Sequence, residues 1–292
     1  MAPDSLGMAD VRALDIDRAL KGFADEEFVF KDFLTVTPTI AREMRWWQKT
    51  SGVLDSTDTT GITASQIPSA FGTLGPIMEQ TATRLTSYAQ HFQAWSPWFT
   101  YADVRDSDPD MFAANLRDLK RAVENQIDFR ILNVLSGSCP LSGAAAGTGW
   151  GDTSNGNPFL DLLSGSMEIR KNGYDISRVV ALVHPDNFKG LMNYFVTVKG
   201  SSVPQFASGV VESGIITKIA NVGITTSNNC TEGQVLMLVP QRAATWKSFT
   251  PLTAVTKEEP GMGVQIRVWE DGEVLFTDPR AAYLITGVGV VA

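Results

Sequence analysis

Residues 107–137 read SDPDMFAANLRDLKRAVENQIDFRILNVLSG, and this stretch decides the fold. Asp108 is a suitable N-cap, Pro109 suits the first helical position, and Gly137 is placed to end a helix. The pattern predicts a single helix over residues 108–136, a rod of about 40 Å. Apolar residues recur every three or four positions and predict one buried stripe, with polar residues on the other sides: Phe112, Leu116, Leu119, Val123, Ile127, Ile131 and Val134 against Arg117, Asp118, Arg121, Glu124, Asn125 and Asp128.

The composition favours a globular protein that does not bind nucleic acid directly. The chain has 292 residues, of which 43% are hydrophobic, so it can bury a substantial core. The net charge is −8, whereas nucleic-acid binding needs clustered Lys and Arg. No apolar run reaches membrane-spanning length and the start lacks the pattern of a signal peptide, so we expect a soluble protein made inside a cell, with no membrane partner.

Residues that could perform chemistry are few. Cys139 and Cys230 lack metal-ligand spacing and are expected to be free thiols, with a single disulfide as the alternative. Of the two histidines, His184 ends an apolar run and is expected to pack or to cap a helix. Adjacent carboxylates such as Glu258 and Glu259 lie in polar surroundings. We therefore predict no catalytic residues, no cofactor, no metal site and no enzymatic activity.

Upstream of the long helix, the pattern predicts an arm and a projecting loop. Residues 1–38 contain a short amphipathic segment and are expected to lie against another part of the molecule, with a disordered tail as the alternative. Residues 39–49 carry long side chains at both parities, which suits an exposed strand. Residues 50–80 are polar and rich in turn residues. An extended pattern resumes over residues 81–92, which predicts two strands on either side of a long loop. A helix over residues 82–92 is the alternative.

Aromatic residues gather just before the long helix and on the first strand. Such clusters fill a core or a subunit interface more often than they bind a cofactor. We expect these aromatic residues, together with apolar residues of the loop and its strands, to lie at a subunit interface: Trp46, Trp47, Leu74, Ile77, Tyr88, Trp95 and Trp98.

Downstream, helices and strands alternate before a β-rich end. Residues 137–156 are rich in Gly, Ser and Ala and are expected to form a flexible connector. Helices are predicted over residues 157–173 and from Pro185, on either side of a buried strand over 179–184, which indicates an α/β or α+β layer. Strands follow at 215–224, 235–240, 243–249, 252–258, 264–270, 273–276 and 283–291, and Asp271-Gly272 is expected to form a hairpin turn.

The order of these elements resembles the major capsid protein of tailed bacteriophages and related archaeal viruses, the Hong Kong 97-type fold that encapsulin shells share. The residues that support the resemblance are VVALVHP at 179–185, with Asn187, Phe188 and Leu191 after it, and TDPRAAY at 277–283. The resemblance covers the chain from about residue 30 to its end. It implies an α+β fold with an N-terminal arm, an extended loop, a peripheral domain with a long spine helix, and an axial domain.

The resemblance also implies a division of the chain. Residues 1–38 would be the arm and residues 39–92 the extended loop with its flanking strands. The peripheral domain would comprise residues 93–174 with the spine helix, and the axial domain residues 175–258. The C-terminal strands, residues 259–292, would return to the peripheral domain.

By this resemblance the protein is a major capsid protein that assembles into an icosahedral shell around viral double-stranded DNA. Its expected partners are copies of itself in hexamers and pentamers, a separate scaffolding protein, a portal protein and decoration proteins, with packaged DNA only an indirect partner. The expected location is the virion, after assembly in the host cytoplasm.

Some family members cross-link their subunits covalently through a lysine in the extended loop. Here no Lys lies between Lys49 and Lys120, so we expect a shell without that cross-link.

Other functions stay open at this point. An encapsulin-like compartment shell would have the same fold, and the long polar loop over residues 50–80 favours the virus. A hydrolase using carboxylates would need a pocket that joins acidic residues scattered along the chain. A surface adhesin or tail component is supported only by the β-rich C-terminal half.

Overall fold

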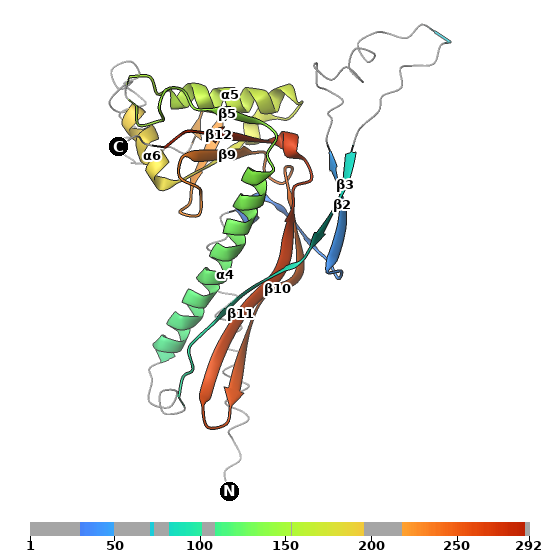
Figure 1. Ribbon diagram of the computed structural model, residues 1–292, viewed down its shortest axis with the longest axis vertical. Helices are drawn as coiled ribbons and strands as arrows, with labels where there is room; N and C mark the ends of the chain where they lie inside the picture. Colours follow the sequence, from blue (N-terminus) through green and yellow to red (C-terminus); the bar gives the residue numbers. More distant parts are fainter. Residues whose placement is uncertain are drawn as a thin grey trace.

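The structure is a computed structural model that describes residues 30–49, 71–72, 82–100, 109–152, 154–195 and 218–289, with the backbone alone for residues 109–114. It is built from one long helix, a four-stranded sheet, a six-stranded sheet and a two-stranded hairpin (Figure 1). The expected helix over 108–136 is confirmed as α4, Pro109–Gly137. In Figure 1 α4 is a rod beside the four-stranded sheet, against β4 and β11.

The buried side of α4 is wider than the apolar stripe alone. The apolar residues Val123, Ile127 and Ile131 are buried, as expected. Glu124 and Asp128 were expected on the polar side, yet both are buried, and so is Lys120. Lys120 pairs with Glu124 at 3.1 Å, and Asp128 Oδ1 accepts the backbone N–H of Phe30 at 3.4 Å. The end of the arm packs against the polar side of the helix, so this side is buried too. A prediction of one buried apolar stripe does not include this contact.

The four-stranded sheet has the order β1-β10-β11-β4. The 3-10 helix η1, Lys31–Phe33, leads into β1, Thr35–Pro38, which runs parallel to β10, Thr245–Glu259. The two strands expected at 243–249 and 252–258 are one strand, β10, with register shifts near Thr250. On the far side, β4, Gln90–Trp95, is antiparallel to β11, Gly263–Leu275.

The hairpin turn expected at Asp271-Gly272 is wrong, because β11 runs through both residues without a break. The turn between β10 and β11 lies at residues 260–262 instead, where Gly261 has φ +85° and Met262 N–H donates to Glu259 O at 3.1 Å. Gly272 has a packing role: a Cβ there would lie 2.6 Å from Cζ2 of the Trp246 indole. The glycine makes room for a buried side chain from the neighbouring strand.

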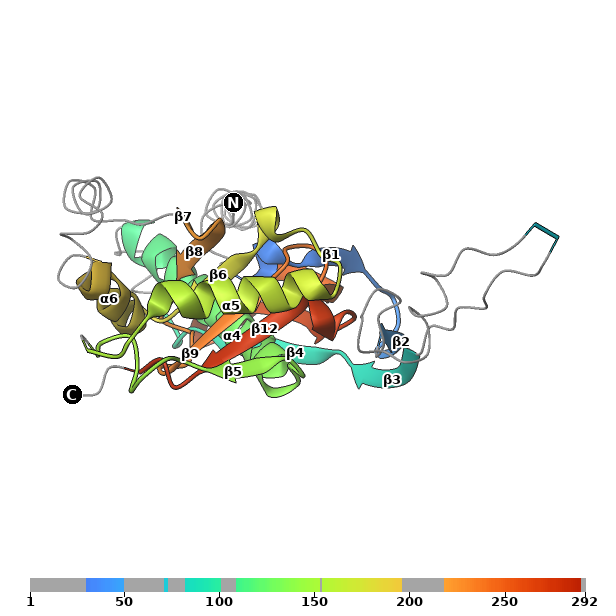
Figure 2. The same ribbon diagram turned by 90° about the horizontal axis from the view of Figure 1, so that it is seen from above.

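The six-stranded sheet has the order β5-β12-β9-β6-β8-β7. The predicted buried strand over 179–184 is confirmed as β6, Val180–Val183, which lies between β8, Val222–Thr226, and β9, Gln234–Leu238. Helix α5, Pro158–Lys171, lies over this sheet and contacts β12, and α6, Pro185–Asn193, follows β6 (Figure 2). The 3-10 helix η2, Ile176–Arg178, joins α5 to β6. The strand expected at 215–224 is divided by a tight turn at Ala220 and Asn221, with β7, Lys218–Ile219, before it.

The Gly-rich segment after α4 is more ordered than the expected flexible connector. It contains β5, Ser142–Ala144, which pairs in parallel with β12, Ala282–Thr286. Trp150 is buried, and its indole N–H donates to Asp161 on α5 at 2.9 Å. A buried indole and a pairing between strands 142 residues apart in sequence hold this segment in place, and neither produces a local sequence pattern.

Sheet membership groups the C-terminal strands differently from the expectation. β11 lies with β10 and α4, but β12, which follows the 3-10 helix η4, Pro279–Ala281, lies in the six-stranded sheet beside β9. The C-terminal strands are therefore divided between the two larger sheets, and only β11 lies beside the spine helix α4. A boundary at residue 258 would also divide the β10–β11 hairpin. The buried side chains of Ala282 and Ile285 explain the position of β12, because they complete the core of the six-stranded sheet.

Candidate subunit-interface surfaces

The first candidate surface is the two-stranded hairpin of β2, Glu43–Lys49, and β3, Ala82–Tyr88. The pairing confirms two strands on either side of residues 50–81 and decides against the helix alternative. In Figure 1 the hairpin stands to one side of the two larger sheets. Trp47 is 64% exposed and Tyr88 60% exposed, whereas Trp46 packs against the core and its indole N–H donates to Ser87 Oγ at 3.0 Å.

The hairpin is fixed to the molecule at the end from which residues 50–81 leave. The Lys49 N–H donates to the Thr277 carbonyl at 3.1 Å, and the Gln48 side chain donates to the Phe276 carbonyl at 3.1 Å. Residues 276 and 277 directly follow β11, which belongs to the four-stranded sheet. The hairpin is therefore held at a defined place rather than on a free linker.

The second candidate surface, here called the tryptophan face, comprises Trp95, Trp98, Lys257, Arg267 and Trp269. The Arg267 guanidinium lies 4.9 Å from the Trp95 ring centroid and 4.8 Å from that of Trp269. Lys257 Nζ lies 5.7 Å from the ring of Trp98. In contacts of this kind the quadrupole of the aromatic ring attracts the cation. Trp95 is 43% exposed.

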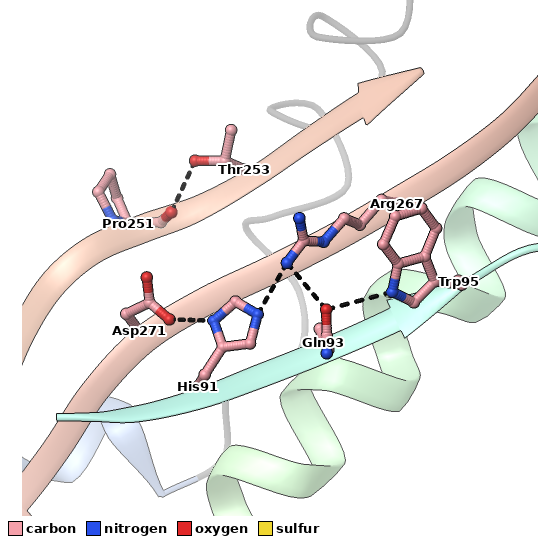
Figure 3. A network of polar contacts seen from close by, with 7 residues as sticks. All are labelled: His91, Gln93, Trp95, Pro251, Thr253, Arg267 and Asp271. Carbon is pink, nitrogen blue, oxygen red and sulfur yellow. Dashed lines mark hydrogen bonds and ion pairs between the residues drawn. The ribbon is translucent and has the colours of Figure 1, made fainter. Parts of the chain in front are cut away.

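A polar network extends the tryptophan face along β4 and β11 (Figure 3). The Arg267 Nη2 contacts His91 Nε2 and Gln93 Oε1, each at 2.8 Å. On the other side of the imidazole, His91 Nδ1 is hydrogen-bonded to Asp271 Oδ1. The Trp95 indole N–H donates to Gln93 Oε1 at 3.1 Å. These contacts fix the outward side chains of two neighbouring strands in one arrangement.

The predicted interface residues therefore divide between two surfaces. Trp46, Trp47 and Tyr88 lie on the hairpin, and Trp95 and Trp98 lie on the tryptophan face. Leu74 and Ile77 lie outside the described residues. Lys257, Arg267 and Trp269 were not among the predicted residues. The sequence carries part of their signal, because the stretch VQIRVW at 264–269 alternates in side-chain type and places Arg267 and Trp269 on the same parity.

A buried ion pair attaches the arm to the four-stranded sheet. Lys31 Nζ donates to Glu270 Oε1 at 2.5 Å, and the Trp246 indole N–H donates to the same oxygen at 3.1 Å. Glu270 is fully buried and the Lys31 side chain is 14% exposed. The carboxylate is thus compensated by one cation and one neutral donor.

Other residues of possible chemical interest have structural positions. His184 caps α6, where its Nδ1 accepts the Asp186 N–H at 3.3 Å, so the predicted capping role is confirmed. Both cysteines are free, and burial raises the pKa of Cys139 to about 11 and that of Cys230 to about 12. Within the described ranges, no group of three or more His, Cys, Asp or Glu side chains could hold a metal ion. None of the helices in those ranges has the length and apolarity to span a membrane.

Comparisons with known proteins identify the architecture. A family model described as phage capsid protein matches residues 98–285, more than half of the chain. Three similar solved structures are the virus-like particle of Pyrococcus furiosus, the capsid of Cyanophage P-SCSP1u and the SrpI encapsulin complex of Synechococcus elongatus, with TM-scores of 0.62, 0.64 and 0.59. Each is 11% identical, and the alignments cover 94%, 88% and 89% of this chain and 99%, 87% and 86% of the other. No curated protein matches the sequence. The likeness confirms the predicted α+β, Hong Kong 97-like fold.

Proposed function

The chain belongs to the phage capsid protein family, and from this premise we propose that it is a major capsid protein that self-assembles into an icosahedral shell around double-stranded DNA. A capsid shell protein needs surfaces that are complete only when neighbouring subunits are present. The observation that supports this proposal best is the β2–β3 hairpin. A two-stranded sheet by itself is marginally stable, and this one exposes Trp47 and Tyr88.

Charge complementarity supports a particular contact between subunits. Residues 50–81 contain Asp55, Asp58 and Glu79 but no Lys or Arg. The tryptophan face carries two cations among large aromatic rings, of which Lys257 also pairs with Glu259 at 3.3 Å and Arg267 lies between two indoles. We propose that residues 50–81 of one subunit lie on the tryptophan face of its neighbour, because opposite charges favour encounter and fix the register of an interface.

The remaining partners follow from the same proposal. The shell forms hexamers and pentamers of this chain, assembles in the host cytoplasm with scaffolding and portal proteins, and can carry decoration proteins. The net charge of −8 suits the wall of a shell, because DNA that is packaged inside should not adhere to it. The protein's role is structural, with no reaction of its own. An encapsulin-like compartment shell is the second candidate, favoured by the fold shared with SrpI; a genomic neighbourhood with terminase and portal genes decides for the virus.

The test removes the extended loop and keeps the hairpin closed. Lys49 and Ala82 are the last paired residues of β2 and β3, so Asn-Gly can replace residues 50–81 and form a two-residue turn. We expect the full chain to form closed shells in negative-stain electron microscopy. The loop-replaced variant should remain a monomer or small oligomer with a cooperative unfolding transition.

Two further variants separate the loop from the surface that receives it. Arg267→Glu places a like charge opposite the acidic loop and should abolish shells, whereas Lys171→Glu changes a cation on α5 that is 69% exposed and should leave them intact. Shells formed by the loop-replaced variant would refute the role of the loop. A full chain that stays monomeric while folded would count against the shell function itself.

A further inference from the structure

His91 lies between two oppositely charged groups on the outward side of the four-stranded sheet (Figure 3). Its Nδ1 faces the Asp271 carboxylate, and its Nε2 is 2.8 Å from Arg267 Nη2. A carboxylate only accepts hydrogen bonds, and a guanidinium only donates them. Both contacts are therefore satisfied when Nδ1 carries the proton and Nε2 is a bare acceptor, which is the neutral imidazole.

We propose that His91 is a pH-sensitive switch that holds Arg267 on its own sheet while the imidazole is neutral and releases it when the imidazole is protonated. Histidine is the side chain that ordinarily changes charge between pH 5 and 8. Protonation puts a second N–H on the imidazole, directed at a guanidinium that also donates. The hydrogen bond is then lost, and two positive charges face each other at the same distance.

The surroundings of His91 leave Arg267 as the group that moves. From β11 it faces one carboxylate, Asp271, and one cation, Arg267. The next outward side chain on its own strand is the uncharged Gln93. On β10, Thr250 and Thr253 pair with Asp271 and Trp269, and both are uncharged. Among the described residues, protonation therefore strengthens the contact with Asp271 and breaks only the contact with Arg267.

Release of Arg267 changes the tryptophan face. Arg267 Nε is buried and has no hydrogen-bond partner within the described residues, so Gln93 is the one acceptor left to the side chain. The guanidinium lies between the Trp95 and Trp269 rings, and any displacement alters the surroundings of both indoles. The face also gains one positive charge, so its affinity for carboxylates rises as pH falls.

The experiment titrates the full chain from pH 8 to pH 5 while sedimentation velocity reports its assembly state. We expect a single-step change in tryptophan emission. Because the sequence has two histidines, histidine-specific 13C labelling gives two imidazole resonances, and that of His91 should titrate with the same midpoint as the emission. His91→Gln should lose the emission step, since the amide can donate to Asp271 and accept from Arg267 but does not titrate.

His184→Gln is the matched control, because it removes the other histidine, which caps α6. This variant should keep the step and identify the His91 resonance, and thermal unfolding at pH 8 checks that both variants are folded. A step that persists in His91→Gln, disappears in His184→Gln, or has a midpoint different from that of the His91 resonance would overturn the switch. The readout needs no shell, so its failure leaves the proposed shell function untouched.

Discussion

At the scale of single residues, one buried charge pair helps to hold the arm on the four-stranded sheet. Glu270 has no contact with solvent, and Lys31 is the cation that compensates it. Removing one partner of a buried pair leaves an uncompensated charge, which costs about 3–5 kcal/mol, whereas an exposed pair contributes about 0–1 kcal/mol. We expect Lys31→Ala to lower the free energy of unfolding by about 3–5 kcal/mol in urea denaturation.

Lys171→Ala is the control for that measurement. Lys171 pairs with Glu168 at the same distance, 2.5 Å, but the two side chains are 69% and 40% exposed, so its loss should cost about 1 kcal/mol or less. Equal effects of the two substitutions would mean that burial does not set the strength of the Lys31–Glu270 pair.

At the scale of elements, Gly272 lets β11 pass close to the buried indole of Trp246 on the neighbouring strand. A methyl group at this position would meet Trp246 Cζ2 at 2.6 Å and the Lys247 carbonyl at 2.8 Å. Overpacking of this kind costs about 1–3 kcal/mol, so we expect Gly272→Ala to reduce the free energy of unfolding by that amount. Gly137→Ala, at the end of α4, meets nothing within 4 Å and should leave stability unchanged or slightly higher. If Gly272→Ala matched Gly137→Ala, the packing role assigned to Gly272 would be wrong.

At the scale of the whole molecule, cohesion between subunits should be non-covalent. A lysine nucleophile is absent from the sequence between Lys49 and Lys120, which includes all of residues 50–81. Boiling assembled particles in denaturing detergent should therefore give a single band of monomer in gel electrophoresis. Bands at multiples of the monomer mass would show a cross-link formed from another part of the chain.

The sequence predicted the elements whose signal is local. The long helix, the strand over 179–184 and the helix from Pro185 depend on periodicity and capping, which residues a few positions apart specify. The paired strands on either side of residues 50–81 also followed from side-chain parity. Trp47, Tyr88 and Trp95 are exposed, and their place at a subunit interface stays a prediction.

The tertiary structure alone decided everything that depends on contacts between distant segments. Gly272 looks like a turn residue in the sequence because glycine favours turns, but the indole of Trp246 explains its presence within β11. The tryptophan face needs β4 and β11 side by side, although Trp95 and Arg267 are far apart in the chain. Local patterns determine which residues form helices and strands, because those interactions span a few positions. Which strands pair, and which side chains then meet, is determined by burial of the whole core, and no short stretch of sequence contains that information.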